Sequence, residues 1–315
     1  MLIWAAEAAA QSFMPPQGTE LAGKIDSLYT FLVWISLISS VLVIGGMVYF
    51  AVKYRRQTAN DKTAYIPHNA FLEFLWSFIP FVLFMVVFGW GWWIFHDMRK
   101  MPENAFEVHV TGQKWYWDFA YKSGRKTSGE VYVPVGEPVK LIMNSRDVIH
   151  SFYIPGFRVK QDVVPGRYTA LWFEATKLGT FQVFCTEYCG TEHSTMLAKV
   201  HVLPREEFDQ WLLTDPYKGL TATEVGQKVF SSKCVACHNI TTEKKVGPGF
   251  AGIFGTERQL EDGSTVVADE TYIRTSILNP ASQISAGYPN AMTPFQGQIS
   301  EEELRGIIEY IKSLK

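Results

Sequence analysis

Two long apolar runs near the N-terminus place the strongest constraint on how this chain can fold. Leu28–Val52 carries no charged residue, and Phe71–Phe95 is interrupted only by Glu73 near its start and by Pro80 within it. A helix that crosses a bilayer needs about 20 predominantly apolar residues, so each run is long enough to span a membrane. A buried core helix is the alternative for either run, but two such runs in succession favour a transmembrane helix hairpin.

Charges beside these runs predict the orientation of the hairpin. Lys53, Arg55, Arg56 and Lys62 lie in the short connection between the runs. Cytoplasmic loops are enriched in such basic residues. The connection is therefore expected on the cytoplasmic side, with the N- and C-termini on the periplasmic side. The tryptophans within 90–93 would then lie at the outer interface, where an aromatic belt forms.

Charge and cysteine content narrow the classes of function. The formal net charge of the 315 residues is −2, which gives no reason to expect nucleic-acid binding. All four cysteines fall in two short motifs, so none is left for a framework of structural disulfides. Residues 1–27 are expected to be an N-terminal segment, and the sequence leaves open whether it is a signal-peptide remnant or a plain tail.

One short stretch gathers soft metal ligands. Cys185 and Cys189 are followed by His193 and Met196, and a further histidine, His150, lies upstream after a strand-like run. Thiolate, thioether and imidazole ligands select copper or, less specifically, zinc. Two thiolates could bridge two copper ions, each with one histidine and one weak axial ligand. The cysteine pair alone leaves a disulfide or a zinc knuckle open as alternatives.

A second motif, Cys234-Val235-Ala236-Cys237-His238, is the signature of covalent c-type haem attachment. In such a site the two thiols form thioethers with the haem vinyl groups, and the histidine binds the iron. A chance match, a redox pair or a zinc pair is the alternative. Neighbouring patterns favour haem, because 222–230 predicts an amphipathic helix and 300–303 predicts a capping box that opens a last helix. Gly226 and Gly306 would let these two helices cross closely.

From Phe106 to about Pro204 the apolar pattern changes to a period of two. Four runs in this region predict strands: Glu107–Val110, Glu130–Val133, Val139–Met143 and Thr180–Phe184. Short strands separated by Gly and Pro breaks are typical of a β-sandwich or barrel.

The spacing of the first motif, together with the upstream His-Ser pair, resembles the CuA site of cytochrome c oxidase subunit II. The resemblance implies a binuclear copper centre bridged by the two thiolates, with these ligands: His150, Cys185, Glu187 through its backbone carbonyl, Cys189, His193 and Met196. It also implies that the side chain of Glu187 binds magnesium at the contact with subunit I.

Further roles follow from the same resemblance. Gly112–Asp118 is similar to the aromatic stretch beside CuA, which implies that electrons enter at Trp115. Phe71–Ser77 is similar to the segment whose glutamate, here Glu73, stands at the mouth of a proton channel in subunit I. Arg146-Asp147 departs from the family pattern, because relatives that dock a soluble cytochrome c tend to carry paired acids there.

The region after the haem motif is similar to that of class I cytochromes c. Lys245–Gly249 implies that the carbonyl of Pro248 accepts a hydrogen bond from His238, the proximal ligand. Met292 is implied as the distal ligand. Met–His ligation raises the reduction potential and suits electron transfer.

The resemblance covers nearly the whole chain. It implies a multidomain membrane protein, a subunit II with a cytochrome c domain fused at its C-terminus. The expected parts are a two-helix transmembrane hairpin at 28–98, an all-β cupredoxin-like Greek-key barrel carrying CuA at 103–204, a linker or short helix at 205–220 and an all-α cytochrome c domain at 221–315.

The implied function is to bring electrons into a respiratory haem–copper oxidase of the bacterial inner membrane. A donor, either cytochrome c or a quinol-oxidising complex, would reduce haem c, and electrons would pass to CuA and on to subunit I. Oxygen would be reduced to water there, with proton pumping, and subunit III and the lipid bilayer are further expected partners. One alternative is a copper–haem relay for another terminal reductase. The other is a copper carrier or assembly factor, but the sequence lacks the thioredoxin-like pattern expected of one.

Overall fold

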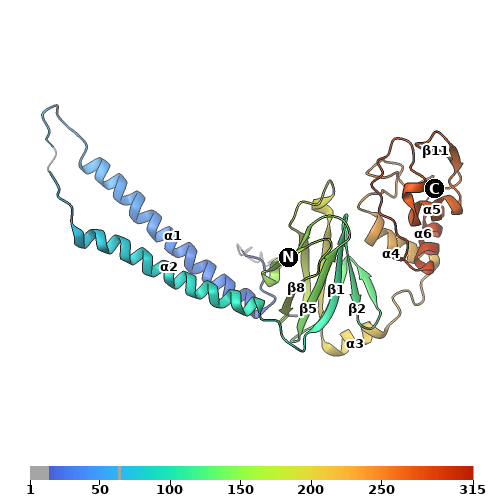
Figure 1. Cartoon of the computed structure of the whole chain (residues 1–315), viewed down its shortest axis with the longest axis horizontal. Helices are drawn as coiled ribbons and strands as arrows, with labels where there is room; N and C mark the ends of the chain where they lie inside the picture. The colour runs from blue at the N-terminus through green and yellow to red at the C-terminus, as the bar shows by residue number, and fades with distance from the viewer. Residues whose placement is uncertain (1–13, 63–64, 315) are drawn as a thin grey trace, which may run out of the picture. The chain divides into compact units, whose positions relative to one another are not determined.

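A computed structural model describes residues 14–62 and 65–314, which form two compact units (Figure 1). One unit contains the chain up to Glu103 together with Gly156–Arg158. The other contains Asn104–Pro155 and the chain from Val159 onward. The apolar start of the expected N-terminal segment, Met1–Ala10, lies outside the described residues.

Two long helices make up most of the first unit: α1, Glu20–Lys53, and α2, Ala70–Arg99. Thr19 and Asn69 precede them, and their side chains accept hydrogen bonds from backbone N–H groups of the first turns, as N-caps do. Large apolar side chains are exposed along both helices. A helix that is apolar all round needs an apolar environment, so the expected pair of membrane spans is confirmed.

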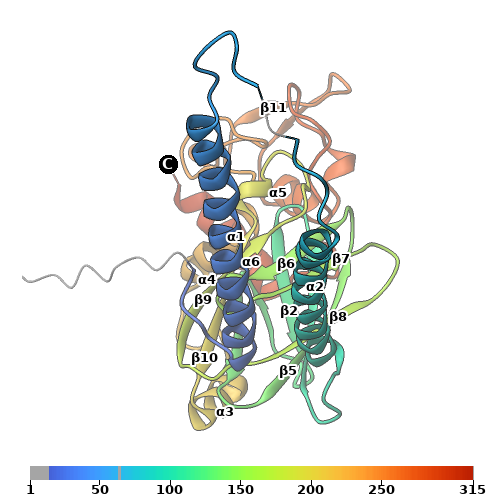
Figure 2. The same cartoon turned by 90° about the vertical axis from the view of Figure 1, so that its left-hand side faces the viewer.

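The two helices contact each other, and Figure 1 shows them close together where α1 begins and α2 ends and farther apart toward their connection; Figure 2 shows the same pair from the side. The rings of Phe31 and Trp90 have centroids 5.6 Å apart, and Lys24 Nζ lies 3.1 Å from Asp97 Oδ2. Helix α1 begins eight residues before the apolar run that starts at Leu28, because its N-cap is Thr19. The first turns of α1, which carry Glu20, Lys24 and Asp26, therefore lie outside the apolar run.

The second unit begins with a two-sheet β domain. The first sheet has the order β3-β2-β1-β5-β8, in which β1 pairs antiparallel with β2 and parallel with β5. Alternate residues of β5, among them Leu141 and Met143, are fully buried, which is the period of a half-buried strand. The strands of this sheet are β1, Phe106–Gln113; β2, Tyr116–Tyr121; β3, Lys126–Ser128; β5, Pro138–Ser145; and β8, Thr169–Glu174.

The second sheet has the order β4-β10-β9-β6-β7, with β10 parallel to β4 and antiparallel to β9. Strands of the two sheets contact each other, for example β2 with β4 and β5 with β7. The expected all-β domain is confirmed, and the four predicted runs all fall within observed strands. The strands of the second sheet are β4, Glu130–Pro134; β6, His150–Ile154; β7, Val159–Val163; β9, Gly179–Cys185; and β10, Leu197–Leu203.

The expected linker contains a helix, α3, Arg205–Leu213. Its Trp211 stacks on Tyr132 of β4 with ring centroids 4.3 Å apart, and the Arg125 guanidinium lies 3.9 Å from the Trp211 ring centroid. The linker is therefore packed on the β domain rather than free of it.

The C-terminal part is mainly helical, as expected. Its elements are α4, Ala222–Val229; a π-helical turn, Phe230–Cys234; α5, Glu270–Leu278; α6, Glu301–Ser313; and a small hairpin of β11, Glu257–Gln259, and β12, Thr265–Val267. The capping box predicted at Ser300 is present. A Cβ on Gly226 would lie 2.0 Å from the carbonyl oxygen of Gly306, so the predicted close crossing of α4 and α6 is confirmed.

Candidate copper and haem sites

The soft ligands of the first motif meet at one end of the β domain. His150 opens β6 and Cys185 closes β9, and the two strands pair with Phe152 opposite Cys185. The chain then passes through a loop that contains Cys189 and a short 3₁₀ turn at His193–Thr195 before β10 begins. Two neighbouring strands and one loop therefore bring residues distant in sequence to a single point.

The donor atoms converge in pairs. The sulfurs of Cys185 and Cys189 lie 3.8 Å apart. Nδ1 of His150 lies 3.9 Å from the Cys185 sulfur, and Nδ1 of His193 lies 3.4 Å from the Cys189 sulfur. The Met196 sulfur lies 3.8 Å from that of Cys189. Each thiol thus has its own imidazole, and the two thiols face each other.

These separations fit metal binding. Bonds to sulfur of about 2.3 Å and to nitrogen of about 2.0 Å place two donors on one ion roughly 3–4 Å apart. The backbone oxygen of Glu187 lies 3.3 Å from the Cys185 sulfur and completes the group. Both cysteines are free and buried, and their separation is well beyond the roughly 2.05 Å of a disulfide bond. The disulfide alternative is therefore not the arrangement present.

Protonation of the two thiols is linked. The hydrogen bond from Cys189, with a further one to His150, lowers the pKa of the Cys185 thiol to about 3 despite burial. The same contact with Cys185, together with burial, raises the pKa of Cys189. A metal that binds both sulfurs as thiolates must displace any proton they carry.

Asp147 holds His150 in place, a role that the sequence analysis missed. Its Oδ1 lies 2.8 Å from Nε2 of His150, which is fully buried. The carboxylate also accepts hydrogen bonds from the backbone N–H groups of Lys114 and Val148, at 2.7 Å each. Burial opposes a charged His150, but the bond to Asp147 outweighs it and raises the pKa of the imidazole. An acid three residues before a candidate ligand was the available signal.

Trp115 touches the candidate copper site directly. Its ring is buried, and its Nε1–H donates a 3.1 Å hydrogen bond to the backbone carbonyl of Cys189. Gly190 allows this approach, because it has a φ of 121° and a Cβ there would lie 3.0 Å from the Trp115 ring. A side chain at position 190 would therefore strain the backbone and crowd the indole.

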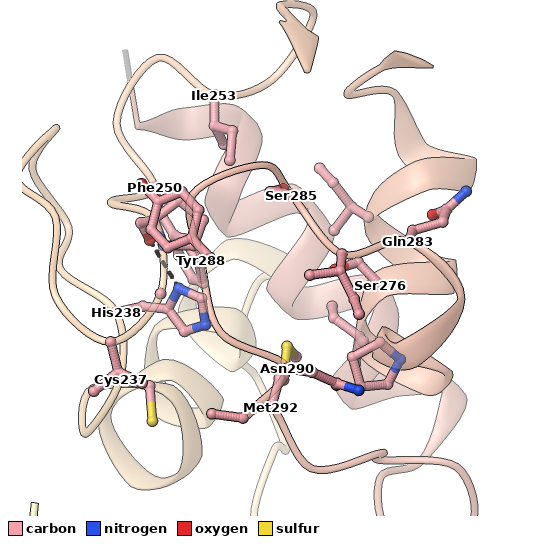
Figure 3. Close-up of a pocket in the computed structure, with 18 of the residues that line it drawn as sticks. Cys237, His238, Phe250, Ile253, Ser276, Gln283, Ser285, Tyr288, Asn290 and Met292 are labelled. Carbon is pink, nitrogen blue, oxygen red and sulfur yellow. Dashed lines mark hydrogen bonds between the residues drawn. The ribbon is translucent and has the colours of Figure 1, made fainter. Parts of the chain in front are cut away.

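The second motif borders an apolar hollow in the C-terminal part (Figure 3). Its lining is mostly apolar, as the lining of a cofactor site generally is. Cys237, His238 and Met292 all line it, and Figure 3 shows the His238 ring and the Met292 side chain at the same hollow. Burial raises the pKa of the Cys237 thiol to about 11.

His238 is fixed by its surroundings. Its Nδ1 lies 2.8 Å from the carbonyl oxygen of Pro248, drawn dashed in Figure 3. Nε2 is then the nitrogen that can bind a metal, because a metal-binding histidine generally donates its other ring N–H to a carbonyl or carboxylate. A Cβ on Gly247 would lie 2.3 Å from the His238 ring. Cys234 lines a neighbouring hollow that also borders Cys237, His238 and Met292. Two thiols, one oriented histidine and one methionine beside apolar space fit a covalently attached haem.

Comparison with known proteins decides the family. "Cytochrome c oxidase subunit 2" of Alkalihalophilus pseudofirmus is 32% identical over 318 residues, covering 96% of this chain and 90% of that protein. The chain belongs to the cytochrome c oxidase subunit II family. Three family descriptions match in succession: the subunit II transmembrane domain at residues 7–89, the subunit II periplasmic domain at 125–203 and cytochrome c at 223–315.

Other members of the subunit II family are similar over shorter lengths. "Alternative cytochrome c oxidase subunit 2" of Bradyrhizobium diazoefficiens is 31% identical, covering 60% of this chain and 79% of that protein. The crystal structure of the periplasmic domain of subunit II of cytochrome oxidase from Bradyrhizobium japonicum is 32% identical. It covers 36% of this chain and 94% of that one, with a TM-score of 0.35.

Membership of the subunit II family has direct consequences. The chain is a two-span membrane protein, and its family implies an oxidoreductase in which subunit I is its partner. Its periplasmic domain implies CuA and its cytochrome c domain implies haem c. His150, Cys185 and Cys189 form a buried group that could hold a metal ion, with their ligand atoms all within 4.8 Å of one another.

The resemblance to the subunit II family implies roles for two carboxylates, those of Glu187 and Glu73. The side chain of Glu187 is exposed, although its carbonyl faces Cys185. Glu73 lies in the first turn of α2, half exposed, with Oε1 3.5 Å from Nδ1 of His68. Both carboxylates are accessible on the described chain.

Proposed function

We propose that this chain is the subunit through which electrons enter a respiratory haem–copper oxidase of the bacterial inner membrane. The observation that carries the proposal is the paired arrangement of the copper donors. Two thiols 3.8 Å apart each face a separate histidine. Sulfurs shared in this way suit two copper ions bridged by two thiolates, which is the centre that the family implies.

His150, Cys185, Cys189, His193 and Met196 would hold the copper, with the Glu187 carbonyl as a further ligand. When bound, the copper centre and the haem supply one-electron redox chemistry. The protein holds the donors on two paired strands and the loop that follows Cys185. Asp147 keeps the imidazole of His150 oriented, and burial excludes water from the site.

In the C-terminal domain, Cys234 and Cys237 would attach the haem, and His238 and Met292 would be the iron ligands. The bond from His238 to Pro248 would orient the ring toward the iron. We infer that electrons from an external donor, cytochrome c or a quinol-oxidising complex, enter at this domain. They then reach the copper domain beside Trp115.

The remaining assignments concern the contact with subunit I. The exposed carboxylate of Glu187 would bind magnesium there, and Glu73 would stand at the entrance of the proton channel. Subunit I would reduce oxygen to water and pump protons, and subunit III would complete the assembly. The basic connection between α1 and α2 supports a cytoplasmic loop, with both termini in the periplasm.

Purification of the tagged full chain from membranes in mild detergent tests the proposal. We expect a haem–copper subunit I to co-purify, and oxygen consumption with a reduced donor to be lost in His150→Ala while co-purification persists. Co-purification with a nitrogen-oxide reductase would favour a relay for another terminal enzyme. Recovery of the chain alone, with copper that transfers to other proteins, would favour a copper carrier.

A further inference from the structure

Lys233, the residue before the haem motif, reaches the β domain. Its Nζ lies 2.6 Å from Oδ1 of Asp118 on β2 and 2.6 Å from Oγ of Ser128 on β3. It also lies 5.0 Å from the ring centroid of Tyr116. The Lys233 side chain is only 8% exposed. A buried ammonium group is tolerated when it is paired and hydrogen-bonded, and here all of its partners belong to the β domain.

A second contact lies beside this ion pair. Phe295, which follows Met292 in the haem-domain loop, stacks on Tyr116 with centroids 6.2 Å apart and planes 9° apart. Gln113, at the end of β1 and 1% exposed, donates a 2.9 Å hydrogen bond to the side-chain oxygen of Gln298. Gln298 is itself oriented by a 2.7 Å hydrogen bond to the carbonyl of Pro294.

The same residues connect the two candidate cofactor sites. A second hollow beside the haem motif is walled from both domains, by Lys114, Tyr116, Lys233, Cys234, Met292 and Phe295. Tyr116 is the neighbour of Trp115, whose indole donates to the carbonyl of Cys189. A short chain of contacts therefore runs from Phe295 through Tyr116 and Trp115 to a candidate copper ligand.

We propose that Lys233 is a positioning residue that locks the haem domain onto the copper domain, so that Phe295 stays stacked on Tyr116. The expected consequence is rapid transfer of one electron from reduced haem to oxidised copper, and this consequence rests on the proposed function. No bond forms or breaks in that transfer. Because the ammonium group is buried and its carboxylate partner is partly buried, salt screens the pair less than it screens exposed charges. The docked state should therefore persist at an ionic strength that separates surface-bound partners.

The chain's own haem domain occupies the surface of the β domain around Tyr116 and Asp118. Asp118 and Tyr116 are covered by the chain's own haem domain, so a separate cytochrome cannot use them. This agrees with the absence of paired acids at Arg146-Asp147. The external donor would then have to deliver its electron to the haem domain.

Hydroxyl-radical footprinting of the full chain, loaded with copper and haem in detergent, tests the docking without reference to activity. Tyr116 and Phe295 are 4% and 6% exposed, so both rings should be protected. In Lys233→Met we expect their oxidation rates to rise at least about tenfold, because removal of the ammonium group leaves the partly buried carboxylate of Asp118 without its cation. Asp118→Asn serves as the second variant, since it lies outside the haem attachment motif.

Lys228→Met is the matched control. Lys228 lies on α4, is exposed, and its Nζ contacts a backbone carbonyl 3.4 Å away, that of Pro216. Its loss should leave both rings protected. Laser photoreduction of the haem gives a second readout, and we expect reduction of the copper to slow at least about tenfold in both interface variants and to be unchanged in the control.

Protected rings in both Lys233→Met and Asp118→Asn, or exposed rings in the unaltered chain, would overturn the docking proposal. Protected rings in the unaltered chain, exposed rings in both variants and no electron transfer in any of them would support docking and contradict the proposed function. The two failures are therefore distinguishable.

Discussion

Asp147 makes His150 a better metal ligand by accepting a hydrogen bond from its Nε2–H, on the side of the ring away from Cys185. Replacement by Asn keeps the size of the side chain and removes its charge. We expect Asp147→Asn to weaken copper binding by about 10–100-fold, which is the usual effect of losing a partner of a metal-bound histidine. Competition with a copper chelator measures the affinity, and redox titration should give a shifted reduction potential.

Asp162→Asn is a suitable control for that experiment. Asp162 lies on β7, which pairs with β6, the strand that carries His150. It accepts hydrogen bonds from Ser151 and Lys160 rather than from His150. Its replacement should leave copper affinity within about twofold. Equal copper affinities for Asp147→Asn and the unaltered chain would show that the hydrogen bond to His150 does not contribute to copper binding.

The crossing of α4 and α6 depends on two glycines. A methyl group on Gly226 would lie 2.0 Å from the oxygen and 2.5 Å from the carbon of the Gly306 carbonyl, so the helices must separate. We expect Gly226→Ala to lower the free energy of unfolding of the haem domain by at least about 1–3 kcal/mol, as overpacking does. Denaturant unfolding followed by haem absorbance measures this. The exposed neighbour Gln227→Ala should change it by less than about 0.5 kcal/mol, and similar losses in both variants would contradict the account.

An ion pair connects strands β1 and β5 in addition to their backbone hydrogen bonds. Glu107 lies 2.7 Å from Lys122 and 3.0 Å from its cross-strand partner Lys140. These bonds lower the pKa of Glu107 from 4.5 to about 2. The ion pairs should therefore stabilise the fold above the ordinary glutamate pKa, and this contribution should be lost as pH falls toward about 2.

Thermal unfolding of Glu107→Gln tests that sign. The variant should have a slightly lower melting temperature than the unaltered chain at neutral pH, and the difference should shrink below about pH 4. Glu174→Gln on β8 provides an exposed glutamate for comparison. A difference that grows as the pH falls would contradict the assignment.

Across the whole molecule, the sequence predicted what local patterns encode. Apolar length predicted the two spans, alternation predicted the strands, and the spacing of Cys185, Cys189 and His193 predicted a shared metal site. The contact of Lys233 with Asp118 was not predicted, because nothing around a single lysine indicates which distant carboxylate it meets. The bond from Trp115 to the Cys189 carbonyl was missed for the same reason, since it depends on how the two sheets bring their ends together.

The central claim is that the two thiols hold a pair of coppers in a chain that also carries haem c. Electron paramagnetic resonance of the full chain, loaded with copper and haem in detergent, tests it most directly. The account predicts one unpaired electron shared over two equivalent copper nuclei, seen as a many-line hyperfine pattern beside a low-spin haem signal. The simpler pattern of a single copper ion, or no copper signal in the oxidised chain, would contradict it.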